Sequence, residues 1–542
     1  MPDNRPTLSE RITRTIDAVV DAVAPNLALK RQTARQLRSL NEQRGRIVSR
    51  LMERHFDGAD NDSRLRGDRW LASRLSIDSA LDADLADLRE NADELYRTFG
   101  YITGAIDHRT DNVIGTGLNP KAWIQPYRDL ISAEQAKVWN EELNELYRRW
   151  APHAGGRRRS FSRLQRLAHR TWRKGGDSFI VLSDVGRANS PIPLQLNVVG
   201  PKRVETPYDQ AASPRIRLGV QKTEDGREIE GYWIRETDPH DTVDNTPKHR
   251  FYPADRVCHL LEELWPDQSR GLPWCFSIIP EAKDFLDYRE TVIINAQIGA
   301  CQTAFINTSN PELYGQNGLN SAGQVELEPG RFTVLGHGDT VTPFNPSQPQ
   351  TTYGMFSEWS LLGMSAGINY PFGWMVKDRR RATFSAGRLE EIDGSVPLRS
   401  DFETVRNNFI APVWERLVAE AVILGESTIP PDLFHAMPWL FTRFKLLAQG
   451  RPWIDPTKEV TAAILAKEHN LDTLEGIHSK LGKDTEEVLD TRAAERGMEY
   501  ARDIVPPIYT GTVPKSGEDD QDGDEDDPDP VTDPADEEAF VR

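Results

Sequence analysis

The sequence has few cysteines and lacks the common nucleotide-binding and zinc-protease signatures. Its 542 residues include three cysteines, Cys258, Cys275 and Cys301, whose spacing fits no zinc pattern and which cannot all pair with one another. No Walker sequence or H-E-x-x-H occurs in the chain. We therefore predict buried thiols in a reducing compartment, no metal site, no cofactor, no catalytic residues and no enzymatic activity.

Long apolar runs are also missing. No run approaches the roughly 18 residues that a membrane-spanning helix needs. The first twenty residues interleave Arg11, Arg14 and Asp17 with apolar residues, which is unlike the core of a signal peptide. We expect a protein that is made in the cytoplasm and has no membrane partner.

Positive charge is scarce relative to negative charge. The formal net charge is −18, and residues 518–542 contribute −12 of it through thirteen acidic residues and one arginine. This proline-punctuated segment predicts a disordered acidic tail over 506–542, either a solubilising tail or a docking element. The remainder carries about −6, so the composition excludes a protein that grips nucleic acid through a broad basic face.

The stretch "NVIGTGLNP" (112–120) resembles the start of a phosphate-binding turn. A dinucleotide fingerprint requires a third glycine, but Pro120 occupies that place. Apolar residues before the turn recur at helical rather than strand spacing: Leu95, Phe99, Ile102, Ile106 and Val113. We therefore interpret the turn as a helix C-cap with a proline shortly after it, and not as a nucleotide site.

The order of expected elements is that of an α+β protein. Helical patterns extend to about Val113 and return at 132–153, where Ser132 and Gln135 form a capping-box pair. Antiparallel strands are expected over 177–260, with Asp225-Gly226 as a hairpin turn. A basic amphipathic segment at 27–56 predicts a helix that is either a solvated face or a nucleic-acid contact.

The second half is again mostly helical in pattern. A long helix is expected over 281–306, followed by strands near 325–344 and a helix at 353–368. An irregular loop then leads into a helix near Ser385, and helices continue to about Ala501. Asp177, His259 and His337 are interpreted as structural rather than catalytic.

Seven segments, taken in order, resemble the lambda-type family of bacteriophage portal proteins. They are "LRGDRWLASRL", "DHRTDNVIGTG", "LAHRTWRKGGDSFIVL", "DQSRGLPWCFSIIPEAKDFLDYRETVIINAQIGACQTAFI", "LEPGRFTVLGHGDTV", "DRRRATFSAGRLEE" and "WIDPTKEVTAA". The resemblance spans about residues 10–500. Its one departure is the run Arg379, Arg380 and Arg381, which is more basic than the family pattern.

The resemblance implies a portal fold in which each subunit contributes to a ring, usually of about twelve copies. The implied segments are an N-terminal helical arm (1–60), a wing of helices and an antiparallel β unit (61–275), a stem helix (276–305), a mixed α/β clip (306–352), a returning stem helix with the tunnel loop (353–395), a helical wing return and crown (396–505) and the acidic tail (506–542).

The implied function is a DNA channel at one vertex of the capsid, used for genome packaging and ejection. The implied partners are other copies of the chain, double-stranded DNA bound without sequence preference, the terminase large subunit, the major capsid and scaffold proteins, and a head–tail connector. The implied location is the virion, after synthesis in the host bacterial cytoplasm.

The tunnel loop supplies the candidate DNA contacts: Lys377, Asp378, Arg379, Arg380 and Arg381. An ordinary exposed loop would also explain this run of charges. Two other functions stay open at this point. A head–tail adaptor or scaffold would lack a channel loop, and a packaging nuclease or NTPase would need convergent carboxylates or a phosphate loop.

Overall fold

The structure is a computed structural model that describes residues 75–502, apart from 157–158, 188–189, 243–246, 301–303, 308–339, 344–352, 379–382, 448–449 and 451–455. The predicted N-terminal arm, the acidic tail and most of the predicted clip lie outside the described residues. The chain divides into two compact units, Met1–Gln449 and Gly450–Arg542.

Two helices, α3 (Ile77–Thr98) and α4 (Gly100–Val113), form the start of the described chain. The helical spacing predicted for this region is confirmed, although the chain breaks into two helices at Phe99, whose backbone is extended. The turn that follows α4 is the predicted helix C-cap. Gly115 has φ 53° and Gly117 has φ 120°, and a Cβ on Gly117 would lie 2.4 Å from the Cβ of Ser162. The two glycines are therefore required by the turn and not by a phosphate.

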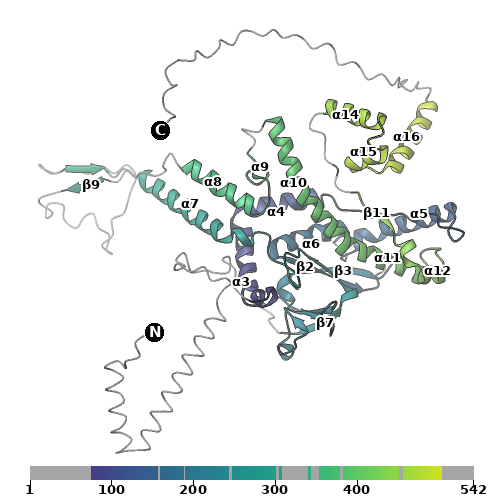
Figure 1. The fold of residues 1–542 in the computed structure, drawn as a ribbon, viewed down its shortest axis with the longest axis horizontal. Coiled ribbons are helices and arrows are strands. Elements are labelled where there is room, and N and C mark those ends of the chain that lie inside the picture. The colour runs from purple at the N-terminus through teal and green to yellow at the C-terminus, as the bar shows by residue number, and fades with distance from the viewer. Residues whose placement is uncertain are drawn as a thin grey trace, which may run out of the picture. The chain divides into compact units, whose positions relative to one another are not determined.

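Two further helices precede the first sheet in the chain. In α5 (Ala133–Trp150) the predicted capping box is confirmed, because Ser132 and Gln135 each bond the other's backbone N–H. Helix α6 (Phe161–Gly175) ends at Gly176, which has φ 87° and leads directly into a strand. Helix α6 packs on that strand and on its neighbour, so it covers one face of the sheet (Figure 1).

The predicted antiparallel β unit is confirmed as two sheets. The first has the order β3-β2-β8, with β2 (Asp177–Asp184) between β3 (Leu194–Val199) and β8 (Val257–Leu261). The second has the order β4-β5-β6-β7, formed by Ile216–Arg217, Val220–Lys222, Ile229–Arg235 and His249–Pro253. The hairpin between β5 and β6 turns at Gly226, which has φ 71°.

Helices α7 (Ile279–Ala300) and α8 (Tyr353–Gly367) lie side by side (Figure 1). The expectation that the first helix continues to 306 is wrong, because Ala304–Asn307 forms strand β9, which pairs antiparallel with β10 (Thr340–Pro343). Phe305 and Ile306 favour a strand once a partner strand is available, and no helical pattern of the isolated sequence reveals that partner.

The chain after α8 is more helical than the predicted irregular loop. Residues Phe372–Val376 form the short helix α9, because Phe372 and Met375 pack into the core shared with α3 and α8. Helix α10 (Phe384–Val405) contains Pro397 and passes through one π-helical turn, Arg406–Ile410, into α11 (Ala411–Leu424). Helices α12 (Pro431–Ala436) and α13 (Pro438–Phe441) follow. Strand β11 (Phe444–Lys445) then pairs with β1 (Lys121–Ala122).

Three apolar clusters hold the first unit together. The largest joins α5, α6, the first sheet and α11 around Trp150, Trp172 and Trp414, which are almost completely buried. Burial raises the pKa of both Cys258 and Cys275 to about 12, so these cysteines are neutral thiols, as predicted. Cys301 lies outside the described residues.

The second unit contains α14 (Pro456–Glu468), α15 (Leu474–Lys480) and α16 (Thr485–Tyr500). None of the side chains in these three helices is buried. Across the described part of the chain, no helix combines the length and the apolar character required to cross a bilayer.

We expect Gly271→Ala to lower the free energy of unfolding of the first unit by about 3 kcal/mol or more. The added methyl group would clash with backbone atoms, which cannot move aside as a flexible side chain can. A Cβ there would lie 2.0 Å from the carbonyl oxygen of Gly176 and 2.7 Å from Oδ1 of Asp177. Gly104→Ala is the matched control, since it lies in α4 with nothing within 4 Å. In urea denaturation, the midpoint concentration should be lower than that of the parent for Gly271→Ala and not for Gly104→Ala. Equal midpoints for the two variants would contradict the close approach of Gly271 to Gly176 and Asp177.

Candidate functional site

The structure describes both ends of the predicted tunnel loop. Lys377 is exposed and ends α9 in the left-handed conformation, with φ 57°, and Asp378 is half-buried. Arg379, Arg380 and Arg381 lie outside the described residues. The helix that the sequence places near Ser385 is capped by Thr383, whose Oγ1 accepts a hydrogen bond from Ala386 N at 3.2 Å. Thr383 has the extended backbone of an N-cap, whereas Ser385 already lies in the first helical turn.

Helices α9 and α10 are joined directly across the base of the loop. Gly373 N, in the first turn of α9, donates to Oε1 of Glu390 from α10 at 2.5 Å. A Cβ on Gly373 would lie 2.5 Å from that carboxylate, and a Cβ on Gly394 would lie 2.6 Å from the ring of Trp374. Gly373 and Gly394 thus allow α9 and α10 to approach closely. The two ends of the loop that connects these helices are therefore fixed relative to each other.

Aromatic contacts attach this base to helix α4 and to the segment that precedes α7. Nδ1 of His108, from α4, is hydrogen-bonded to Oη of Tyr370. The Trp374 ring stands edge-on to His108 with centroids 5.2 Å apart. Trp274 Nε1 donates to the carbonyl oxygen of Ile368 at 3.1 Å. The segment that leads into α9 and the middle of this helix are therefore held against residues that come from elsewhere in the chain.

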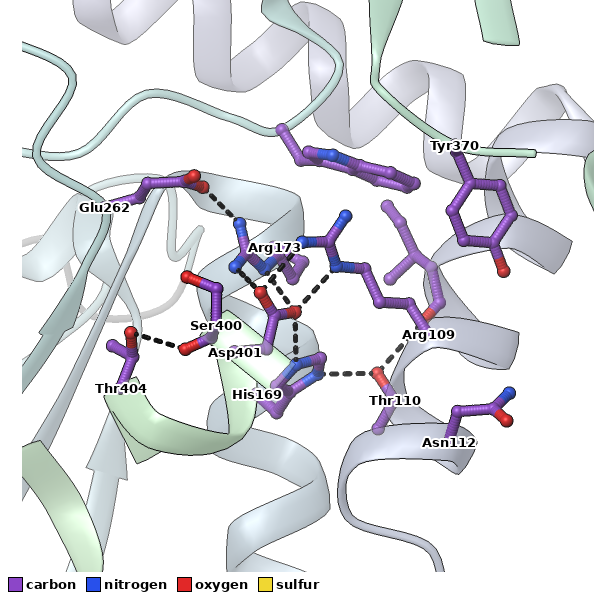
Figure 2. A network of polar contacts seen from close by, with 12 residues as sticks. Arg109, Thr110, Asn112, His169, Arg173, Glu262, Tyr370, Ser400, Asp401 and Thr404 are labelled. Atoms are coloured by element: carbon purple, nitrogen blue, oxygen red, sulfur yellow. Dashed lines mark hydrogen bonds and ion pairs between the residues drawn. The ribbon is translucent and has the colours of Figure 1, made fainter. Parts of the chain in front are cut away.

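Asp401 anchors α10 from the other side, in the middle of a buried ion network (Figure 2). Arg109 from α4 is bidentate, with Nε donating at 2.6 Å and Nη2 at 2.8 Å. Arg173 from α6 also donates twice, with Nε at 3.1 Å and Nη2 in a shorter contact. His169 Nε2 lies 3.2 Å from the same carboxylate. One side chain on α10 therefore ties three helices together.

The charges in this network balance. The two guanidiniums of Arg109 and Arg173 are matched by two carboxylates, those of Asp401 and Glu262. Glu262 accepts a hydrogen bond from Arg173 Nη1 at 2.5 Å. Burial alone would raise the pKa of Asp401, but the charges of Arg173 and Arg109 outweigh it and hold that pKa well below its usual range. Burial lowers the pKa of His169, whose Nε2 is hydrogen-bonded to Asp401 and whose Nδ1 is hydrogen-bonded to the Thr110 hydroxyl, 3.0 Å away. That hydroxyl donates its own proton to the carbonyl oxygen of Ile106 at 2.9 Å.

A second network surrounds Asp177 at the start of β2. Arg89 Nη2 and Arg270 Nε each donate to Oδ2 at 2.6 Å, and Gly271 N donates to Oδ1 at 2.5 Å. His259 Nε2 lies 3.3 Å from Oδ1. Burial would raise the pKa of Asp177, yet Arg270 and the other donors hold it below its usual range. Asp177 and His259 are therefore both buried within this network, and His337 lies outside the described residues.

Sequence reasoning singled out Asp177 and His259 but missed Asp401 and the arginines of both networks. A signal exists for Arg109, which falls on the same helical face as Ile102, Ile106 and Val113, all of them buried. Arg173 likewise follows the buried His169 by one helical turn. A charge on an apolar stripe indicates a buried ion pair. Among the residues described, no group of three His, Cys, Asp or Glu side chains is placed to hold a metal ion.

Residues 63–395 match the family model described as phage portal protein, lambda family. The chain belongs to the lambda family of phage portal proteins. Members of this family are structural and non-enzymatic components of the virion, and the resemblance read from the seven sequence segments is thereby confirmed.

Three curated relatives are similar to the chain. Portal protein B of Escherichia phage lambda is 22% identical over 85% of this chain and 93% of its own length. The portal protein of Escherichia phage N15 is 22% identical over 86% of this chain and 95% of its own. The probable portal protein of Halomonas phage phiHAP-1 is 24% identical, and the match spans 58% of this chain and 61% of that protein.

A solved structure, the neck of a native gene transfer agent particle computed with C12 symmetry, contains a chain that is 12% identical to this one. The match covers 73% of this chain and 94% of that chain with a TM-score of 0.38. At this TM-score the two chains do not superpose closely enough to transfer any residue.

We expect Asp401→Asn to lower the free energy of unfolding by about 3–5 kcal/mol, because it leaves two buried guanidiniums without their carboxylate. Glu403→Gln is the matched control, since Glu403 is exposed on the same helix and its pair with Arg406, at 3.2 Å, should contribute less than about 1 kcal/mol. Chemical denaturation of both variants measures the difference.

The pH dependence gives a second readout. The folded pKa of Asp401 is depressed, so its stabilisation is present above the unfolded value of about 3.9 and is lost as pH falls from there toward the folded pKa. The parent should therefore lose stability below about pH 4 more steeply than Asp401→Asn. Parallel profiles would rule out the depressed pKa.

Proposed function

We propose that this chain forms the ring-shaped DNA channel at one vertex of a phage head, through which the genome is packaged and later ejected. Membership of the portal family supports the class of protein. The observation that carries the finer assignment is the α9–α10 segment, where a loop rich in arginine leaves and returns on a base fixed at Gly373, Trp374 and Asp401. Such a base holds a short basic loop at a set position while DNA moves past it.

The charge distribution suits a conduit better than a clamp. Double-stranded DNA carries one charge per roughly 1.7 Å, so a wall rich in lysine and arginine would bind it and slow it. Lys377, Arg379, Arg380 and Arg381 concentrate positive charge in one short loop, whereas the chain as a whole is acidic. In a ring of about twelve subunits the three arginines would place up to about thirty-six positive charges at one level of the bore.

The remaining segments fit the same proposal. Helices α7 and α8 would form the stem, the residues between them the clip that faces the packaging motor, and α14 to α16 the crown. The proposed partners are further copies of this chain, the terminase large subunit, the capsid and scaffold proteins and a head–tail connector. The portal vertex of the virion is the proposed location.

The first test is assembly. Purified protein should form closed rings of about twelve subunits. Such rings form when each subunit contacts its two neighbours through two different surfaces. Light scattering after size-exclusion chromatography gives the mass, and class-averaged electron micrographs show the central hole. A monomer or simple dimer at every concentration would exclude the channel.

The second test addresses the loop. Replacing Arg379, Arg380 and Arg381 by alanine should leave ring assembly normal but reduce packaging or retention of DNA, and should weaken the salt dependence of retention, because fewer phosphates are contacted. Packaging assays and DNA release at increasing salt measure both effects.

A matched control removes the same charge elsewhere. Arg97, Arg148 and Arg227 have side chains that are 72%, 69% and 85% exposed, so their triple alanine variant changes the net charge equally without touching the loop. It should package and retain DNA as the parent does. If the two triple variants behave alike, the loop is not a DNA-contacting element of the channel.

A further inference from the structure

Helix α8 leaves an apolar stripe uncovered by the described part of its own subunit. Met355, Trp359 and Leu362 recur at i, i+4 and i+7, and their exposed fractions are 64%, 67% and 41%. The opposite face packs inward through Met364, which is fully buried. Glu358 is the one charged residue of the helix. A helix with so little charge and so much exposed apolar surface is typical of a contact surface in an assembly.

Helix α10 carries a second stripe, directly after the arginine loop. Leu389, Ile392 and Val396 recur at i, i+3 and i+7, with exposed fractions of 61%, 53% and 67%. The opposite face of this helix is occupied by the Trp374 ring at Gly394 and by the buried Asp401. Both stripes belong to the first unit, and neither is covered by the packing that holds its own helix in place.

The two stripes match in length and in area. Each extends over eight residues of helix, about 10 Å. The six exposed side chains leave roughly 700 Å² of mostly apolar surface if each large side chain presents on the order of 200 Å² when fully exposed. Apolar atoms make up about 60% of a typical interface, so this area corresponds to an interface of about 1,200 Å², the size of a stable specific contact.

We propose that the α10 stripe of one subunit packs against the α8 stripe of a second copy of the chain. The inference rests on the proposed ring and names the surfaces that build it. Two different stripes, one on each helix, make a heterologous contact that repeats from subunit to subunit and closes into a ring. Pairing of like stripes would instead stop at a dimer.

The contact gives the arginine loop a second support. Within its own subunit, α10 is fixed by Asp401 and Glu390. The neighbouring α8 then holds the opposite face of the same helix, beginning at Leu389, six residues after the N-cap Thr383. The position of each loop is therefore set by two subunits, and the width of the bore at this level follows from the subunit contact.

Cysteine cross-linking tests the pairing. The double variant Trp359→Cys, Ile392→Cys should give a ladder of covalent multimers on a denaturing gel after treatment of the assembled protein with a short bismaleimide. All variants are made in a Cys301→Ser background, in which each single variant and the parent sequence should give no ladder, since the remaining Cys258 and Cys275 are buried. A fast-migrating monomer cross-linked within one chain would overturn the inference.

A second variant covers the case in which the double cysteine variant does not assemble. Ile392→Asp should shift the parent ring to folded monomers, with unchanged circular dichroism, and raise the protein concentration needed for assembly at least tenfold. Val138→Asp is the control, an exposed apolar position on α5 outside both stripes, and should assemble normally.

The outcomes separate the two proposals. Rings of the double cysteine variant that give no ladder, together with rings of Ile392→Asp, would overturn the stripe pairing and leave the channel proposal standing. Failure of the parent itself to form rings would overturn the channel proposal, and the pairing with it. A ladder with loss of rings in Ile392→Asp supports both.

Discussion

The structure around the loop depends on one buried carboxylate. Asp401 lies on α10, and its two oxygens accept from Arg109 on α4 and Arg173 on α6. A buried charge of this kind is costly unless it is fully paired, so the three helices can adopt only the arrangement that brings these groups together. The π-helical turn Arg406–Ile410 and α11 continue from the same helix, and both contribute residues to the largest core cluster.

The Asp177 network fixes the first sheet to its surroundings, as Asp401 fixes α10 to α4 and α6. Arg270 donates to Asp177 and also to the carbonyl oxygens of Val204, Leu218 and Pro201, at 2.6 to 2.8 Å. It thereby joins the first sheet to the connection that leads into the second. Gly271 follows it and leaves no room for a side chain beside Gly176. The segment that enters the long helix α7 is fixed by these bonds rather than by apolar packing alone.

These two anchors place a basic loop on a rigid support. Helix α9 is held by His108 and Tyr370 on one side and by Glu390 on the other. The base of the loop therefore has little freedom, while Lys377 and the arginines after it carry the charge. In the proposed ring, this support would hold the charges of the loop at a fixed distance from the ring axis. The contact between the apolar stripes on α8 and α10 would then fix the position of each loop relative to that of the next subunit.

The sequence by itself determined the features that depend on neighbouring residues. The glycine turn after α4, the capping box at Ser132 and the hairpin at Gly226 all follow from local backbone chemistry, and the family follows from the order of such segments. Only the tertiary structure decided which charges are buried. Arg109 and Asp401 lie 292 residues apart, and no local pattern shows that they meet. The same holds for α9 and for the end of α7 at Ala300, because each depends on partners that the fold brings from elsewhere in the chain.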